Sequence, residues 1–194
     1  MRWYWIDRFI EFESGRYAKA IKNVTAAETY LHDHFPGYPV LPNTLVMEGL
    51  AQTGGLLVFE HNRFAENPIL AKVPAVRFHG EVLPGERLTY TATIEEVKKE
   101  GALVSATSHN GDRLQAEIQM VFAHFHCAHH TGPLSNPWIF LNMMRVLGAF
   151  EVARAADGSR LVEPPLPLEA LVTAGKAGPA RGDQAAPRRR VVPR

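Results

Sequence analysis

The stretch His34–Gln52, HFPGYPVLPNTLVMEGLAQ, decides the fold because its two halves require different structures. The block His32–Pro42 holds three prolines and a glycine, which exclude a helix or a central strand and predict a shaped loop. From Thr44 to about Arg63 there is no proline, and apolar residues occupy most sides of the chain, a pattern typical of a buried helix. Asn43 is the expected N-cap of that helix.

Strand-like patterns flank this helix on both sides. Before it, residues 6–13 and 17–24 mix apolar and charged positions as half-buried strands do, and they predict a hairpin. After it, turn sequences such as Asn110-Gly111 divide four further strand-like runs: residues 69–80, 87–98, 102–109 and 114–125. We therefore predict an α+β fold in which one antiparallel sheet wraps around a long central helix.

The composition excludes several classes of protein. No run of about eighteen apolar residues is present, so no membrane span is expected, and residues 1–9 lack the features of a secretion signal. A single cysteine, Cys127, excludes an intrachain disulfide and favours a cytoplasmic location. The net charge is +1, but residues 175–194 alone carry +5, from six basic residues and one acidic residue, and the rest of the chain shows no pattern typical of nucleic-acid binding.

The chemistry suggested by His34–Gln52 is proton transfer. His34 places an imidazole on the loop, a group that can take or give a proton. Glu48 lies in the first turns of a buried helix, where a carboxyl can serve as an acid, and Gln52 follows one turn later on the same face. The helix start offers backbone N–H groups to a developing oxyanion. Without further context, a structural histidine, a carboxylate stabilised by the helix dipole and a plain surface glutamine explain the same residues.

The order of these residues resembles the 3-hydroxyacyl-acyl-carrier-protein dehydratases of bacterial type II fatty acid synthesis. That family carries His-Phe-Pro-Gly, a proline-rich loop and a helix with Glu-Ala-x-x-Gln-type spacing. This chain has His34-Phe35-Pro36-Gly37, then prolines 39 and 42, then Glu48, Ala51 and Gln52. Further residues that match the family occur in the same order from about Trp5 to Phe125, which makes the resemblance specific.

The resemblance implies a hot-dog fold and a homodimer, or a trimer of dimers, with the pocket between two subunits. His34 of one subunit would remove the C2 proton of a 3-hydroxyacyl thioester, and Glu48 of the other would help the C3 hydroxyl to leave. The backbone N–H of Asn43 would polarise the thioester carbonyl, and Gln52 would orient Glu48. Gly37 would support the loop. The substrate would arrive on the phosphopantetheine arm of an acyl carrier protein, and no metal or other cofactor would be required.

Other residues are expected to act around this centre. Lys72 and Arg77 would help to attract the acidic carrier protein. The expected lining of the substrate tunnel consists of Leu50, Thr53, Gly54, Leu57 and Phe78.

The chain departs from the family pattern at two positions of the loop. Asp33 and Asn43 stand where the family has glycines, which leaves open a non-catalytic subunit that binds acyl chains or the carrier protein. A hot-dog thioesterase is a further alternative, although such enzymes lack the His-Phe-Pro-Gly loop. Glutamate rather than aspartate at position 48 favours dehydration without isomerisation of the double bond.

The sequence divides into three parts. Residues 1–126 form the expected hot-dog dehydratase domain, residues 127–156 a C-terminal helical extension, and residues 157–194 a disordered basic tail. Near the first boundary stands a group of possible metal ligands: His124, His126, Cys127, His129 and His130. Their spacing matches no standard zinc pattern, so no metal site is expected.

Overall fold

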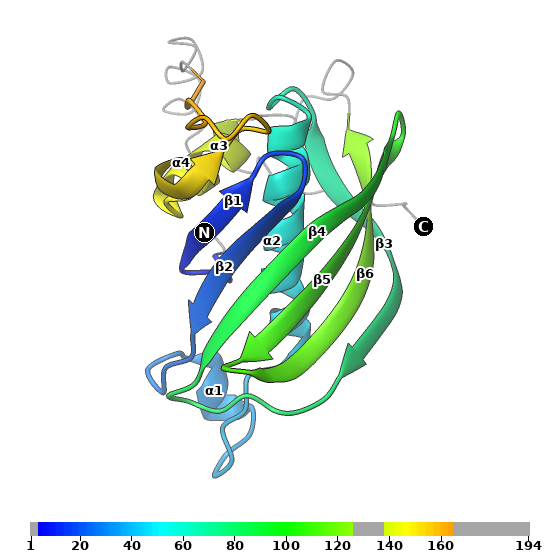
Figure 1. The fold of residues 1–194 in the computed structure, drawn as a ribbon. Coiled ribbons are helices and arrows are strands. Elements are labelled where there is room, and N and C mark those ends of the chain that lie inside the picture. Colours follow the sequence, from blue (N-terminus) through cyan, green and yellow to red (C-terminus); the bar gives the residue numbers. More distant parts are fainter. Residues whose placement is uncertain (1–3, 126–137, 165–194) are drawn as a thin grey trace, which may run out of the picture. The chain divides into compact units, whose positions relative to one another are not determined.

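The computed structural model describes residues 4–125 and 138–164. Its central element is the helix α2 (Asn43–His61), which lies along one face of a seven-stranded sheet (Figure 1). The strands are β1 (Arg8–Glu13), β2 (Tyr17–Asn23), β3 (Asn67–Phe78), β4 (Arg87–Lys98), β5 (Gly101–Asn110), β6 (Arg113–Phe125) and β7 (Ala153–Arg154). Three further helices are α1 (Tyr30–Asp33), α3 (Trp138–Val146) and α4 (Ala149–Val152).

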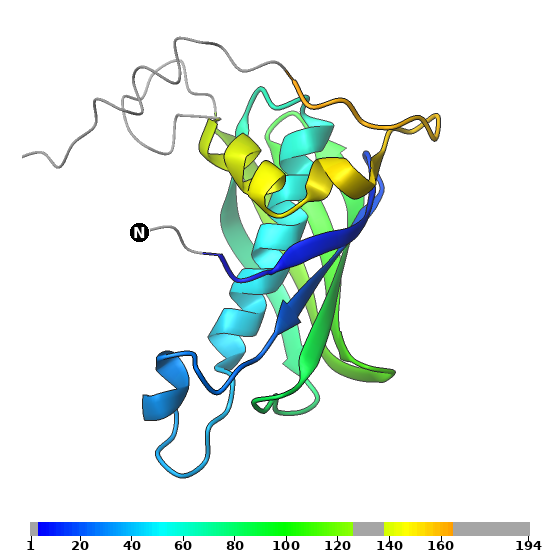
Figure 2. The ribbon, with the colours of Figure 1, turned by 90° about the vertical axis from the view of Figure 1, so that its left-hand side faces the viewer.

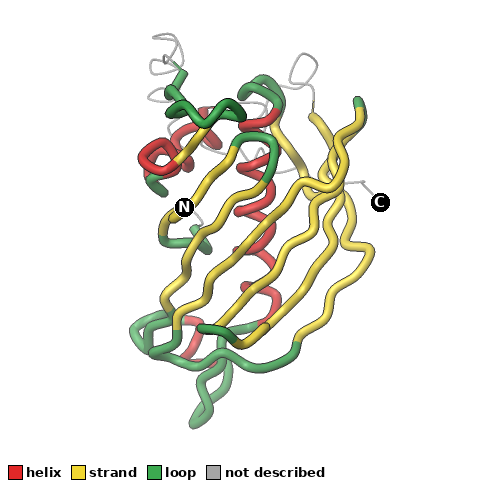
Figure 3. Tube along the Cα trace, in the orientation of Figure 1, coloured by secondary structure: helices red, strands yellow, loops and turns green. Residues whose placement is uncertain are grey.

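The sheet wraps around α2 because its strands bury every second side chain against the helix. Its strand order is β3-β6-β5-β4-β2-β1-β7, with antiparallel pairing from β3 through to β1. Buried and half-buried residues alternate along β5, as expected for a sheet with one face in the core. The α2 residues Leu50, Leu57 and Phe59 are fully buried. The predicted fold of one sheet around a central helix is therefore confirmed (Figure 3).

Three local features differ from the sequence prediction. Residues 30–33 form α1, so His32 and Asp33 belong to a short helix and the irregular loop begins at His34. Asn43 is the first residue of α2 rather than its N-cap, which is Pro42 with φ −55° and ψ 131°. The proline ring restricts φ to this range, and no side chain caps the first turn with a hydrogen bond. The short strand β7 pairs in parallel with β1.

Helices α3 and α4 belong to the same compact unit as the sheet. In α3 the side chains of Leu141 and Met144 are buried, and α3 and α4 cross the C-terminal end of α2 (Figure 2). Residues 157–163, expected as part of the tail, belong to this compact unit: Arg160 forms a β-bridge with Arg154 and Glu163 pairs with Arg145. Residues 165–194 of the expected tail lie outside the described residues. In 4–125 and 138–164, no helix combines the length and apolarity that crossing a membrane requires.

A buried carboxylate near the end of α2 gives a prediction about stability. Glu60 is 5% exposed, its Oε1 accepts a hydrogen bond from Ser14 Oγ at 2.8 Å, and burial raises its pKa. A pKa raised in the folded chain means that the folded state binds the proton more tightly than the unfolded state. Protonated Glu60 therefore contributes to the free energy of unfolding at low pH, and this contribution is lost as pH rises through the raised pKa.

We expect Glu60→Gln to raise the free energy of unfolding at pH 8 by on the order of 1 kcal/mol. The gain should vanish below the pKa of the unfolded carboxyl, where wild-type Glu60 is also neutral. Urea unfolding of both chains at pH 4 and pH 8 measures the difference. The exposed Glu100 offers the control Glu100→Gln, which should show no comparable pH-dependent gain.

Candidate active site

The loop between α1 and α2 holds His34 in a defined orientation. Nδ1 of the imidazole lies 3.0 Å from the carbonyl oxygen of Val40, and the Val40 N–H donates to the carbonyl of His34 at 2.9 Å. A carbonyl oxygen only accepts hydrogen bonds, so this contact places the proton on Nδ1 and leaves the lone pair on Nε2. The ring also stacks on Phe35, with 4.2 Å between the centroids. A neutral His34 held in this way presents Nε2 as a base.

A tight turn closes the loop directly after His34. The N–H groups of Phe35 and Tyr38 donate to each other's carbonyl oxygens at 3.0 and 2.9 Å. Gly37 lies between them with φ +81°, a left-handed conformation that a side chain disfavours. This geometry explains why the turn carries glycine at position 37.

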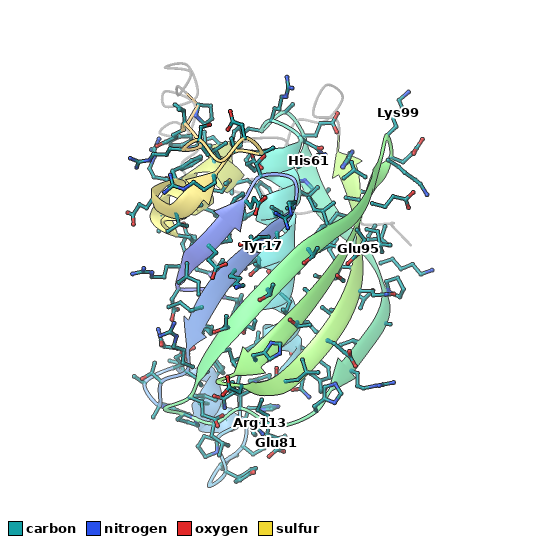
Figure 4. All side chains as sticks on the ribbon, viewed as in Figure 1. Tyr17, His61, Glu81, Glu95, Lys99 and Arg113 are labelled. Atoms are coloured by element: carbon teal, nitrogen blue, oxygen red, sulfur yellow. The ribbon has the colours of Figure 1, made fainter. Side chains whose placement is uncertain are left out.

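The loop is also fastened to the segment between β3 and β4. The hydroxyl of Tyr38 donates to Glu81 Oε2 at 2.6 Å, and the Leu41 N–H donates to the carbonyl of Val82 at 2.8 Å. Arg113 in turn donates to the Glu81 carbonyl at 3.3 Å, and Figure 4 shows Glu81 and Arg113 together at this end of the sheet. Sequence reasoning missed these hydrogen bonds, because no local pattern predicts contacts between residues so far apart along the chain.

Glu48 is held by a chain of two hydrogen bonds. Gln52 Nε2 donates to Glu48 Oε1 at 2.9 Å, and Gln52 Oε1 accepts the backbone N–H of Trp5 at 2.9 Å. The helical spacing of four residues puts both side chains on one face of α2. Trp5 lies just before β1, and its backbone passes close to α2 at Gly49. A Cβ added to Gly49 would lie only 3.0 Å from the carbonyl oxygen of Trp5. Gln52 is thereby fixed at both ends, and so is the orientation of Glu48.

A pocket of about 180 Å³ opens beside Glu48. One wall is the face of α2 that carries Glu48, Ala51, Gln52, Gly55 and Leu56. The other walls are mainly apolar and come from β3, β6 and α3. His34 is not among its lining residues in the described part of this single chain. The site therefore has a polar end, at Glu48 and Gln52, and an apolar body.

The residues expected to line the substrate tunnel are not among those that line the pocket at Glu48. Leu50, Thr53, Gly54 and Leu57 are buried on other sides of α2, and a Cβ at Gly54 would touch Val104 of the sheet at 3.1 Å. Phe78, at the end of β3, is half-buried. The structure does not bring these residues together with the pocket at Glu48.

The remaining candidates are exposed or fall outside the described residues, apart from His124, whose side chain is 5% exposed. Asn43 is exposed in the first turn of α2, where backbone N–H groups have no acceptor within the helix. Lys72 and Arg77 are exposed on β3, and Arg77 lies 3.6 Å from Glu117. His124 lies 3.5 Å from Glu66, while His126, Cys127, His129 and His130 are outside the described residues. Over residues 4–125 and 138–164 no cluster of three or more potential metal ligands is present.

Curated relatives of known name are similar to this chain in sequence. The chain is 34% identical over 119 residues to the 3-hydroxyacyl-[acyl-carrier-protein] dehydratase FabZ of Pelotomaculum thermopropionicum. This aligned region covers 61% of this chain and 85% of the relative. It is 44% identical over 101 residues to the FabZ of Pseudothermotoga lettingae, covering 52% and 71% of the two chains.

Solved structures agree on the fold. The chain superposes on the conserved protein PA5202 of Pseudomonas aeruginosa with a TM-score of 0.52, at 18% identity, over 61% of this chain and 87% of that one. It superposes on smu.793 of Streptococcus mutans, solved with acetyl CoA, with a TM-score of 0.51 at 13% identity, over 65% and 94%. These likenesses concern the fold alone, which is the hot-dog fold expected from the sequence.

The family is shown by a match that spans most of the described chain. The model of the FabA-like domain matches residues 3–121, which include the loop of His34, all of α2 and the sheet from β1 to most of β6. Since this match covers more than half of the chain and agrees with the curated relatives, the chain belongs to the FabA-like family.

Proposed function

We propose that this chain dehydrates (3R)-3-hydroxyacyl-acyl-carrier-protein to the trans-2-enoyl form in fatty acid or related lipid or polyketide biosynthesis. It is thus a lyase of the hydro-lyase class, like its relatives named FabZ. The observation that carries the proposal is the pair of oriented proton-transfer groups: His34 with Nδ1 directed at a carbonyl, and Glu48 held by Gln52.

The two groups divide the chemistry of dehydration between them. Nε2 of His34 takes the proton from C2, and the electron pair of the broken C–H bond becomes the C2–C3 double bond. The C3 hydroxyl leaves with a proton from Glu48 as water. During the reaction the thioester oxygen gains negative charge, and the backbone N–H of Asn43 at the start of α2 stabilises it. The two proton transfers balance, so no metal or redox cofactor is needed.

We further propose that the working unit is a homodimer, itself able to form a trimer of dimers, in which His34 approaches the Glu48 of the partner. Two features of the single chain support this. The pocket at Glu48 does not include His34. Strand β3 is the first strand of the sheet order, is twelve residues long and exposes Leu70 and Val76. An open, partly apolar strand edge favours pairing with another chain.

The proposal extends to the partner and the division of the chain. An acyl carrier protein delivers the substrate, and the exposed Lys72 and Arg77 offer positive charge to its acidic surface. We also propose a cytoplasmic location, which the single cysteine of the sequence favours. Residues 1–126 form the catalytic domain, 127–156 an extension and 157–194 mainly a basic tail.

Hydration of a crotonyl thioester by the purified chain tests the function, because it is the reverse of the proposed reaction. Loss of the enoyl absorbance without release of free thiol supports a dehydratase. Thiol release would identify a thioesterase instead. Binding of the acyl carrier protein with no change in the thioester would identify a non-catalytic subunit, the alternative raised by Asp33 and Asn43.

Gln52 provides a test of how Glu48 is positioned. We expect Gln52→Leu to lower kcat about tenfold or more, because it leaves the Trp5 N–H and the Glu48 carboxylate without their partner. Gln52→Glu keeps an acceptor for Trp5 but removes the amide N–H that donates to Glu48, so its loss should be comparable. Gln119→Leu, at an exposed position of β6, is the matched control. Equal rates in Gln52→Leu and wild type would contradict the positioning role.

A further inference from the structure

The pocket beside Glu48 has a wall that comes from beyond the matched family domain. Phe140 and Met143 of α3 line it, whereas the family match ends at residue 121. Both side chains are half-buried, and their spacing of three residues puts them on one face of α3. The C-terminal helix thus contributes surface to the pocket in which the proposed reaction takes place.

This wall lies toward the C-terminal end of α2, whereas Glu48 lies near the start of that helix. The ring of Phe140 packs against the ring of Phe59, with 5.5 Å between the centroids. Phe59 lies eleven residues after Glu48 in α2, which corresponds to about 16 Å along a helix. Figure 2 shows α3 across the C-terminal end of α2. An acyl chain that enters beside Glu48 and follows α2 therefore meets α3.

Apart from Gln52, the residues between Glu48 and α3 that line the pocket are apolar. Ala51 and Gly55 of α2 face the pocket with Phe122 of β6, and a Cβ at Gly55 would lie 3.3 Å from the Phe122 ring. A glycine at this position keeps the space open. The pocket volume of about 180 Å³ is below the roughly 300–1,000 Å³ of typical small-molecule sites. Such a space fits a short aliphatic chain.

The far wall is fixed rather than loosely placed. The neighbouring α3 residues Leu141 and Met144 are 6% and 0% exposed, so they anchor the helix to the body of the unit. We propose that Phe140 and Met143 close the acyl-chain pocket and restrict the enzyme to short 3-hydroxyacyl chains. This inference rests on the proposed dehydratase function and names its substrate class.

The test is a chain-length series of trans-2-enoyl thioesters, from four to twelve carbons, with wild type, Phe140→Ala, Met143→Ala and the double variant. We expect the ratio of long-chain to four-carbon rates to rise about tenfold or more in the alanine variants, since one methylene in an apolar pocket alters specificity about 10- to 200-fold. Ile139→Ala is the matched control, because Ile139 is on the same helix and 41% exposed. It should leave the ratio unchanged.

Met143→Phe separates the proposal from a general loosening of α3. The larger side chain should lower the rates for six and eight carbons while the four-carbon rate is retained, a shift opposite to that of the alanine variants. Unchanged ratios in an active set of variants would overturn this inference and leave the dehydratase function standing. A wild-type chain with no hydratase activity on any chain length would overturn the proposed function and this inference together.

Discussion

Replacing His34 with alanine is expected to lower the rate of crotonyl thioester hydration by about 10²- to 10⁴-fold, the usual contribution of a positioned acid–base group. In the structure Nδ1 of His34 lies 3.0 Å from the Val40 carbonyl oxygen, which leaves Nε2 as the base. Alanine removes this base but keeps the hydrogen bond from the Val40 N–H to the carbonyl of residue 34. The loop is therefore expected to persist while the chemistry is lost.

His32 provides a matched control for this substitution. It is an exposed histidine two residues upstream, in α1, and His32→Ala should retain the wild-type rate. Urea unfolding of both variants shows whether the folded state is preserved. A His34→Ala chain with wild-type stability and wild-type turnover would exclude His34 as the base.

The main elements were predictable because their signals are local. Alternation of apolar and polar residues gave the strands on either side of the helix, and a proline-free apolar run gave α2. β7 has only two residues, and its pairing with Phe12 and Glu13 of β1 depends on where the α3–α4 segment packs. α1 has four residues, too few for a helical pattern to be recognised. The N-cap was misassigned because Asn43 is a good capping residue by type, whereas the adjacent Pro42 already has the required backbone angles.

In the candidate site, too, the contact within one helix was predictable and the contact between distant residues was not. The Glu48–Gln52 contact follows from helical spacing alone, and the structure contains it. The Trp5 N–H that fixes Gln52 lies 47 residues away in sequence, and no spacing rule predicts it. Because α2 is apolar on nearly all sides, the sequence does not reveal which of its faces packs on the sheet and which lines the pocket. Residues 50, 53, 54 and 57 form one stripe, but residues 51, 52, 55 and 56 share the pocket with Glu48.

The second large effect concerns which subunit supplies each group. We expect Glu48→Gln, like His34→Ala, to lower activity by orders of magnitude, because the amide cannot protonate the leaving hydroxyl. The two inactive chains can be co-expressed with different tags, and the mixed dimer purified through both tags. If His34 works with the Glu48 of its partner, one of the two sites in this dimer is intact. The mixed dimer should then regain about half of the wild-type rate.

A second mixed dimer, of wild type with the double variant His34→Ala/Glu48→Gln, gives the opposite expectation. When the site is shared between subunits, the wild-type His34 faces a glutamine and the wild-type Glu48 faces an alanine, so neither site is intact. When both groups come from one subunit, the wild-type chain keeps its own site and about half of the activity remains. Activity in the first mixture and none in the second requires the shared arrangement. The reverse result would place His34 and Glu48 of one chain in the same site and remove the functional argument for the dimer.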